Sequence, residues 1–213
     1  DVHLMGNPHI TTSPVNWKVI AKKVTIGLKK VDPANTDFYE KNRDKFIKKV
    51  DNALFGEKLV ALFGGEMLTE MLLNHTLFDF LEDSYEGQKL VDLLGGWLKI
   101  ALPFRNKDIV AYHKNWAYFS DVFGLNIIGF IEPKPGIPPS AKHVQFMTNL
   151  IKEQDIKMML VASYFEKKSP QMIESKTGIK AVYMPLFTKS VDGVDDNFQL
   201  VDYWLKQILE NIK

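Results

Sequence analysis

The second half of the chain alternates short apolar runs with helix-like segments, and this alternation constrains the fold most strongly. The runs of β-branched or apolar residues lie at 108–113, 126–132, 156–163 and 180–186. Strands that alternate with helices form parallel sheets covered on both faces. A helix is predicted after Ser140, and another near a capping Ser169, with Gly178 past its end. The sequence therefore predicts an α/β region over residues 106–213.

The first half has helical periodicity instead. Apolar residues among lysines at 15–30 predict an amphipathic helix that ends near Pro33. From Asn35, apolar spacings of three and four over 35–59 predict a helix of about six turns, long enough to act as a strut. Residues 64–103 are predicted to be largely helical, at 66–81 and 88–102, with glycines as interruptions.

Composition excludes several classes of protein. Lys+Arg number 27 against 26 Asp+Glu, a net charge of +1, so no basic field favours nucleic acid as a partner. The longest apolar runs, such as 125–131, are far shorter than the ~20 residues of a membrane-spanning helix. The chain has no cysteine, which excludes disulfides and thiolate sites, so a bound metal must use nitrogen and oxygen ligands.

Because the chain opens with Asp1, we expect that an upstream segment or signal has been removed.

Two of the five histidines lie where a ligand site is expected. His9 closes the turn Gly6-Asn7-Pro8-His9 just before a helix. His113 ends the predicted strand 108–112, and ligands of open parallel sheets gather at the carboxyl ends of strands. The structural alternative for His113 is a strand-end histidine bonded to a backbone carbonyl. His75 and His143 are interpreted as surface or packing histidines.

Carboxylates are the other candidate ligands, and the familiar catalytic motifs are missing. Asp195 and Asp196 precede the predicted terminal helix 198–212, as helix caps or as ligands. The proline-rich segment 132–139 is interpreted as a stiff connection, and Glu132 is its only candidate for chemistry. The sequence contains no His-Glu-x-x-His, no Gly-x-Ser-x-Gly and no Gly-rich phosphate loop. An enzyme is therefore not predicted.

Several motifs together resemble the cluster A-I solute-binding proteins of zinc and manganese ABC transporters. Their order and spacing match this family, and the resemblance covers nearly the whole chain apart from the helical segment 61–105. The motifs are Gly-Asn-Pro-His at 6–9, Asp-Pro-Ala-Asn at 32–35 leading to Phe-Tyr-Glu-Lys-Asn at 38–42, Tyr-His-Lys-Asn-Trp-Ala-Tyr-Phe at 112–119, the segment 132–140, the strand 156–162 and Gly-Val-Asp-Asp at 193–196.

The resemblance implies the division of the chain. In this family two α/β lobes are joined by a long rigid helix, and the metal lies between the lobes. Residues 1–34 would then be the remnant of an N-terminal lobe and 35–60 the linking helix. Residues 61–105 would be a helical insertion and 106–213 the C-terminal α/β lobe.

The resemblance also implies a ligand set. His9 matches the histidine of the family's Asn/Asp-Pro-His motif, His113 matches the third ligand, and Asp195 the final aspartate, with Asp196 as a second candidate. Because imidazole-rich sites suit zinc and oxygen-rich sites suit manganese, zinc is preferred. The family's first histidine lies in the part of the N-terminal lobe that would precede residue 1. The fourth ligand is thus expected from a lost segment, or from His3, a second chain or water. The motif also departs from the family in continuing as Ile-Thr-Thr-Ser-Pro at 10–14.

The function implied is that of an extracytoplasmic solute-binding protein, periplasmic or at the cell surface with a lipid anchor as one means of attachment. It would capture zinc and deliver it to the membrane permease of an ABC importer. The alternatives are a manganese-specific binding protein, a zinc metalloenzyme with an open coordination position, and a metal-free adhesin or structural envelope protein.

Overall fold

The computed structural model describes residues 6–134 and 136–212, which form two compact units. One unit contains the described residues through Thr12 together with those from Pro103 onward, and the other contains Ser13–Leu102. The predicted α/β region lies in the first unit and the long helices of the first half lie in the second. None of the helices in the described ranges combines the length and apolar character that crossing a membrane requires.

A four-stranded parallel sheet, with the strand order β4-β3-β5-β6, organises the first unit. The predicted parallel α/β fold is therefore confirmed, and each strand is shorter than its apolar run. In the sheet Val110 is paired with Gly129 on one side and with Met159 on the other. The strands are β3 (Asp108–Ala111), β4 (Asn126–Phe130), β5 (Met158–Ala162) and β6 (Lys180–Met184).

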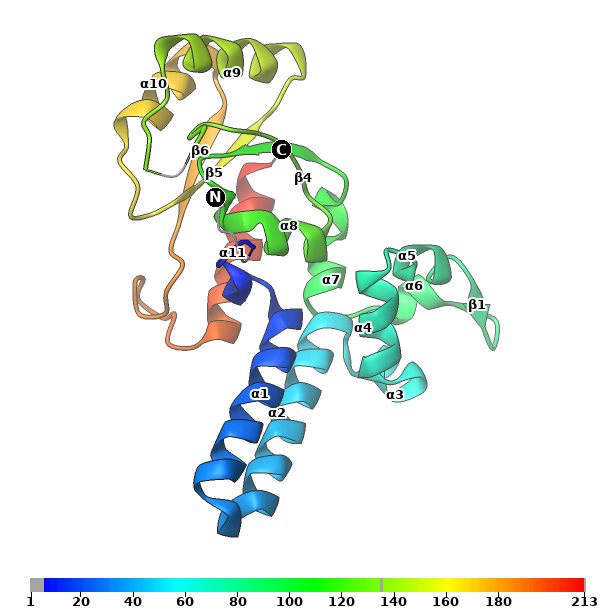
Figure 1. Ribbon diagram of the computed structural model, residues 1–213. Helices are drawn as coiled ribbons and strands as arrows, with labels where there is room; N and C mark the ends of the chain where they lie inside the picture. The colour runs from blue at the N-terminus through cyan, green and yellow to red at the C-terminus, as the bar shows by residue number, and fades with distance from the viewer. Residues whose placement is uncertain (1–5, 135, 213) are drawn as a thin grey trace. The chain divides into compact units, whose positions relative to one another are not determined.

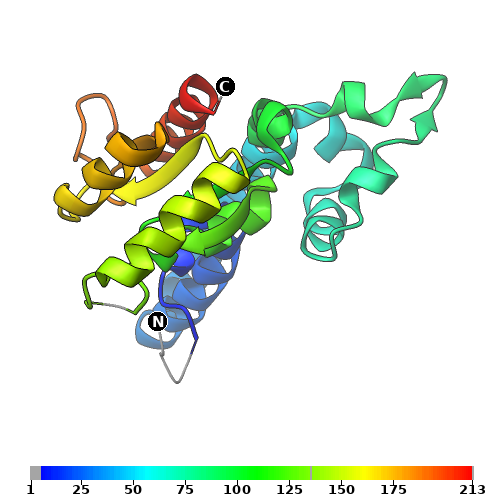
Figure 2. The same ribbon diagram turned by 90° about the horizontal axis from the view of Figure 1, so that it is seen from above.

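Helices cover both faces of this sheet, as Figures 1 and 2 show. α9 and α10 pack on one face, where Met159 and Val161 belong to the same buried cluster. Because side chains alternate along a strand, Met158, Leu160 and Ala162 turn to the other face, which α8 and α11 cover. All of β5 is buried as a result. The helices that cover the sheet are α8 (Ala117–Phe123), α9 (Ala141–Glu153), α10 (Lys168–Thr177) and α11 (Asn197–Asn211). Three short helices accompany them: η1 (Ile10–Thr12), η3 (Leu102–Phe104) and η4 (Lys114–Trp116).

The start of α10 corrects one prediction. Ser169 is not the cap: the helix begins at Lys168, and the Glu166 carboxylate accepts the backbone N–H groups of Lys168 and Ser169. A carboxylate suits this position because it accepts hydrogen bonds from the unpaired N–H groups and its negative charge interacts favourably with the helix dipole. The predicted helix end is confirmed, since Gly178 has a left-handed backbone with φ of 77°.

The second unit is helical, and its two longest helices lie side by side in opposite directions (Figure 1). They are α1 (Pro14–Val31) and α2 (Thr36–Phe55), joined through the short helix η2 (Pro33–Asn35). The predicted helix over 15–30 is confirmed. The predicted helix over 35–59 ends early, at Phe55, and α3 (Glu57–Phe63) follows as a separate helix.

Gly56 is the reason for this break. Its φ is +83°, a value that favours glycine, and a Cβ atom here would lie 2.6 Å from the Cα of Gly95. The backbone N–H of Gly95 donates to the carbonyl of Phe55 at 2.9 Å. The chain therefore turns where two backbones approach too closely for any side chain.

Residues 64–103 are more fragmented than predicted. The helices expected at 66–81 and 88–102 are each interrupted, the first after Leu73, where His75 has a φ of 58°, and the second at Leu94 and Gly95. A short antiparallel hairpin lies between them. The elements are α4 (Gly65–Leu73), α5 (Leu77–Phe80), β1 (Ser84–Tyr85), β2 (Gln88–Lys89), α6 (Leu90–Leu93) and α7 (Gly96–Ala101).

A buried ion pair links three helices of the second unit. Lys18 of α1 donates from Nζ to Asp51 Oδ1 of α2 at 2.5 Å and to Thr69 Oγ1 of α4 at 2.7 Å. Only 9% of the Lys18 side chain and 8% of the Asp51 side chain are exposed. Each charge therefore depends on its partner, because water cannot replace it.

Asp51→Ala is expected to destabilise the second unit by about 3–5 kcal/mol, because it leaves the buried charge of Lys18 without compensation. The measurement is urea denaturation of the whole chain followed by hydrogen-exchange mass spectrometry, which reports each unit separately. The control is Glu40→Ala, which removes the half-exposed partner of Lys29 and should leave the unfolding midpoint nearly unchanged. Equal effects of the two substitutions would contradict the prediction.

Candidate metal centre

His113 lies at the carboxyl end of β3, where the sequence predicts it. Its backbone is extended, with φ −135° and ψ 170°, and it caps the short helix η4. The residue before it is still held by the sheet, because the N–H of Tyr112 donates to Leu160 and its carbonyl accepts from Glu132, both at 2.8 Å. The imidazole therefore projects from a fixed strand end and is only 8% exposed.

A buried carboxylate fixes the His113 ring. Nδ1 of His113 donates to Oε2 of Glu132, and Oε1 of Glu132 accepts the backbone N–H of Gly136 at 2.8 Å. Glu132 is 9% exposed and follows β4, the strand beside β3. Because a carboxylate only accepts hydrogen bonds, Nδ1 must carry the hydrogen, which leaves the lone pair of the imidazole on Nε2.

The turn of the Gly-Asn-Pro-His motif holds His9. The backbone N–H of His9 donates to Asn7 Oδ1 at 3.0 Å, and Asn7 Nδ2 donates to the carbonyl of Lys114 at 3.0 Å. The carbonyl of Asn7 accepts from the Tyr118 hydroxyl, also at 3.0 Å. Asn7 thus attaches the segment that carries His9 to the loop and helix that follow His113.

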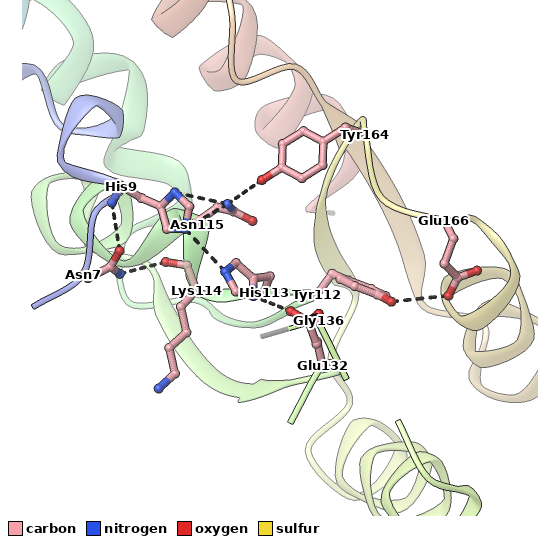
Figure 3. A network of polar contacts seen from close by, with 10 residues as sticks. All are labelled: Asn7, His9, Tyr112, His113, Lys114, Asn115, Glu132, Gly136, Tyr164 and Glu166. Carbon is pink, nitrogen blue, oxygen red and sulfur yellow. Dashed lines mark hydrogen bonds and ion pairs between the residues drawn. The ribbon is translucent and has the colours of Figure 1, made fainter. Parts of the chain in front are cut away.

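The two imidazoles converge, as Figure 3 shows. His9 Nε2 lies 3.4 Å from His113 Nε2. The rings are perpendicular, with an interplanar angle of 89° and centroids 5.4 Å apart. Two imidazole nitrogens at about 2.0–2.1 Å from a tetrahedral zinc are themselves about 3.4 Å apart. The separation therefore suits two ligands of one metal ion.

Asn115 lies beside this pair and is completely buried. Its Nδ2 is 3.4 Å from both ring nitrogens of His9 and donates to the Tyr164 hydroxyl at 2.9 Å. Among the described residues its Oδ1 has no hydrogen-bond partner. His9 is therefore contacted by a neutral amide, whereas His113 is held by a charged carboxylate.

The loop after β5 lines the same edge of the sheet. The Phe165 ring lies 5.6 Å from the His113 ring and 4.6 Å from the Tyr112 ring, measured between centroids. Glu166 accepts from the Tyr112 hydroxyl at 3.3 Å. Burial, followed by the charges of Glu166 and Glu132, raises the pKa of Tyr112 to about 12, so this hydroxyl remains a donor. Burial acts to raise the pKa of Glu166, but hydrogen bonds from the start of α10 and from Tyr112 lower it overall.

The predicted carboxylate ligands lie elsewhere. Within residues 6–134 and 136–212 no three His, Cys, Asp or Glu side chains form a group that could hold a metal, so neither Asp195 nor Asp196 joins the two histidines. Asp196 caps α11 instead: its Oδ1 accepts the N–H of Gln199 at 2.9 Å, and Gln199 Oε1 accepts the N–H of Asp196 at 3.1 Å. His3 lies outside the described residues.

The other histidines agree with their structural interpretation. His143 of α9 donates from Nε2 to the carbonyl of Phe130 at 2.9 Å, and His75 belongs to the second unit. Asn115 and Tyr164 were not predicted, and Glu132 was assigned no role. A signal for Glu132 existed, since it follows the strand beside β3, and the carboxyl ends of neighbouring parallel strands share one edge. No comparable pattern indicates Asn115 or Tyr164.

Solved structures of other proteins share the fold of this chain. The structure of ZnuA has this fold with a TM-score of 0.65 and 20% identity, over 98% of this chain and 63% of that one. The laminin-binding protein Lmb of Streptococcus agalactiae has a TM-score of 0.66 and 19% identity, over 100% of this chain and 67% of that one.

The chain belongs to the family described as ZnuA, zinc-uptake complex component A periplasmic, whose model matches residues 1–91 and 88–211. It is 22% identical over 208 residues to the high-affinity zinc uptake system protein ZnuA of Bacillus subtilis, covering 97% of this chain and 52% of that protein. A metal ABC transporter substrate-binding lipoprotein of Lactococcus lactis is 21% identical over 210 residues, which is 97% of this chain and 55% of that protein. The chain thus spans about half the length of the curated relatives it matches.

The two aspartates before α11 are expected to differ in stability experiments. Asp196→Ala should lower the free energy of unfolding by about 0.5–2 kcal/mol, because it removes the cap of α11. The exposed neighbour Asp195 is the matched control. Asp195→Ala should change the free energy of unfolding by less than about 0.5 kcal/mol. Thermal unfolding of both variants without metal measures the difference, and a larger loss from Asp195→Ala would contradict this assignment.

Proposed function

We propose that this chain binds zinc as the metal-capturing component of an ABC importer, outside the cytoplasm. The observation that carries the proposal is the approach of His9 Nε2 and His113 Nε2 to 3.4 Å, with the lone pair of His113 directed by Glu132. The names of the relatives support it, because the Bacillus subtilis protein is a zinc uptake protein and the Lactococcus lactis protein a metal ABC transporter component. The permease of the importer is the proposed partner, and attachment through a lipid anchor follows the Lactococcus relative.

His9 and His113 are the two ligands that we propose with support from geometry. Asp195 is the carboxylate that the family resemblance favours, with Asp196 and His3 as further candidates. The two imidazoles favour zinc over manganese, because manganese prefers oxygen ligands. A manganese-bound periplasmic metal-binding protein is among the structures with this fold, so manganese is the alternative ion.

The proposed activity is binding, not turnover. A carrier needs protein groups that surround the ion and then release it, whereas a catalytic zinc keeps a position open for a reacting water. The groups next to the pair suit a carrier, because Glu132 and Asn115 are buried and in contact with the imidazoles, so they orient ligands. The family is a transport family, which also supports binding as the activity.

We also propose the division of the chain that the family resemblance implies. Residues 1–34 belong to an N-terminal lobe, 35–60 form the linking helix, 61–105 are an insertion and 106–213 are the C-terminal lobe. We assign the role of the rigid linking helix to α2, which has 20 residues.

Zinc binding should depend on both histidines of the pair. The unchanged chain is expected to bind one zinc, while His9→Ala and His113→Ala should each weaken binding by at least the roughly 10–100-fold that loss of a supporting group causes. His143→Ala is the matched control, because this histidine bonds to a backbone carbonyl, and it should bind as the unchanged chain does. The measurements are metal content by plasma mass spectrometry and competitive titration.

Two outcomes contradict the zinc proposal. Manganese that binds more tightly than zinc in the same titration assigns the chain to the manganese alternative. Absence of stoichiometric binding by the unchanged chain shows that these residues do not suffice as a carrier site. Asp195→Asn in the same series tests the predicted carboxylate, and unchanged affinity removes it from the ligand set.

Glu132 should support the affinity of His113. Glu132→Ala is expected to weaken zinc binding by about 10–100-fold, because His113 loses the carboxylate that fixes its ring and raises its basicity. The zinc affinity of Glu132→Gln should lie between those of the unchanged chain and Glu132→Ala, since the amide oxygen can still accept a hydrogen bond from Nδ1 of His113. Glu166→Gln is the control, because Glu166 contacts Tyr112 and not the pair. Equal affinities across the series would contradict the role of Glu132.

A further inference from the structure

The loop between β5 and α10 holds an aromatic ring, that of Phe165, against His113. The loop is a tight turn, because the backbone N–H of Phe165 donates to the carbonyl of Ala162 at 3.0 Å. Its first residue is held by the neighbouring strand, since the N–H of Ser163 donates to the carbonyl of Met184 at 2.9 Å. The backbone that carries the ring is therefore fixed at the carboxyl edge of the sheet.

The two neighbours of this ring in the sequence are bonded to the segment around His113. The Tyr164 hydroxyl accepts from Asn115 Nδ2 at 2.9 Å, as Figure 3 shows. Glu166 accepts from the Tyr112 hydroxyl at 3.3 Å. Because Tyr112 and Asn115 flank His113 in the sequence, the loop is attached on both sides of the imidazole that its aromatic ring contacts.

The hydrogen bond to Glu132 does not by itself fix the tilt of the His113 ring. A hydrogen bond weakens steeply only when the angle at its hydrogen falls below about 120°, so a bond at one nitrogen tolerates a range of tilts. The Phe165 ring lies 5.6 Å from the His113 ring between centroids, with the planes inclined by 47°. Packing of this kind restricts the movement that the hydrogen bond leaves open.

We propose that Phe165 is a positioning residue that, together with Glu132, directs Nε2 of His113 toward the metal. This inference rests on the proposed function, because it assumes that His113 binds zinc. Groups that bind an ion must be held within about 0.5 Å and 10–20° of the productive geometry by packing and by hydrogen bonds. Glu132 supplies the hydrogen bond, and Phe165 supplies the packing.

The test is a double-mutant cycle of zinc affinity in the whole chain, measured by competitive titration. Phe165→Leu keeps an apolar side chain but removes the flat ring, and it should weaken zinc binding by about 3–10-fold, which matches the contribution of an aromatic pair. In the His113→Ala background the same substitution should change the affinity by less than about twofold, because its effect acts through His113. Phe165→Tyr keeps the ring and should bind zinc as the unchanged chain does.

Phe146→Leu is the matched control for the loss of the ring. Phe146 lies against a histidine outside the site, with its ring 6.1 Å from that of His143 between centroids, so the zinc affinity should not change. Phe165 also packs against Tyr112 and the buried apolar cluster of the sheet. Thermal unfolding of the metal-free variants therefore measures the loss of packing separately from the loss of affinity.

The ring contact can also be observed without zinc. In nuclear magnetic resonance spectra of the metal-free chain, we expect nuclear Overhauser contacts between the Phe165 and His113 rings. Phe165→Leu should shift the signals of the His113 ring protons, because the ring current of Phe165 is lost. Phe146→Leu should leave these signals in place.

The outcomes distinguish this inference from the proposed function. If Phe165→Leu weakens zinc binding equally in the unchanged and His113→Ala backgrounds, Phe165 serves only the fold and the proposal is overturned. Zinc binding by Phe165→Leu as tight as that of the unchanged chain also overturns it, as does Phe165→Tyr that binds as weakly as Phe165→Leu. If the unchanged chain binds no zinc, the proposed function fails and this inference fails with it, even where the ring contact is observed.

Discussion

The buried hydrogen bond between His113 and Glu132 is the contact on which the site depends. It joins the ends of two neighbouring parallel strands, and each partner is anchored independently, His113 by the ladder of β3 and Glu132 by the N–H of Gly136. A buried carboxylate must be paired or hydrogen-bonded. The contact therefore satisfies Glu132 and at the same time gives His113 one tautomer and one orientation.

The site is assembled from segments that are far apart in the sequence but meet at one edge of the sheet. The turn at Asn7 and His9 is attached through hydrogen bonds to Lys114 and Tyr118, and the loop after β5 reaches Asn115 through Tyr164. These segments meet at the carboxyl edge of the sheet because all the parallel strands end there, and the loops to the crossover helices begin there. A rigid sheet thus positions groups that lie mostly on loops.

Much of the fold could be predicted from the sequence, and the reasons for the failures are physical. Apolar runs that alternate with helical segments predict the four strands of the parallel sheet, because strands covered on both faces must be apolar. The break of α2 at Gly56 was not predicted, since it depends on the approach of Gly95 from 39 positions away in the sequence. Local motifs indicated His9 and His113, whereas the contacts of Asn115 with His9 and Tyr164 depend on the tertiary fold. Asp196 shows why sequence alone leaves such a residue ambiguous: an acidic residue before a helix suits a cap and a ligand equally well, and the structure shows that Asp196 caps α11.

The two imidazoles have unequal hydrogen-bond support, because a buried carboxylate contacts His113 and a neutral amide contacts His9. A carboxylate bonded to Nδ1 raises the basicity of Nε2 and strengthens it as a ligand. A neutral amide such as that of Asn115, which contacts His9, does this less. The ring of His113 is consequently fixed by the fold, whereas the contacts of His9 with Asn115 are longer, at 3.4 Å. Under the proposed function, this inequality would make His113 the better-oriented ligand of the two.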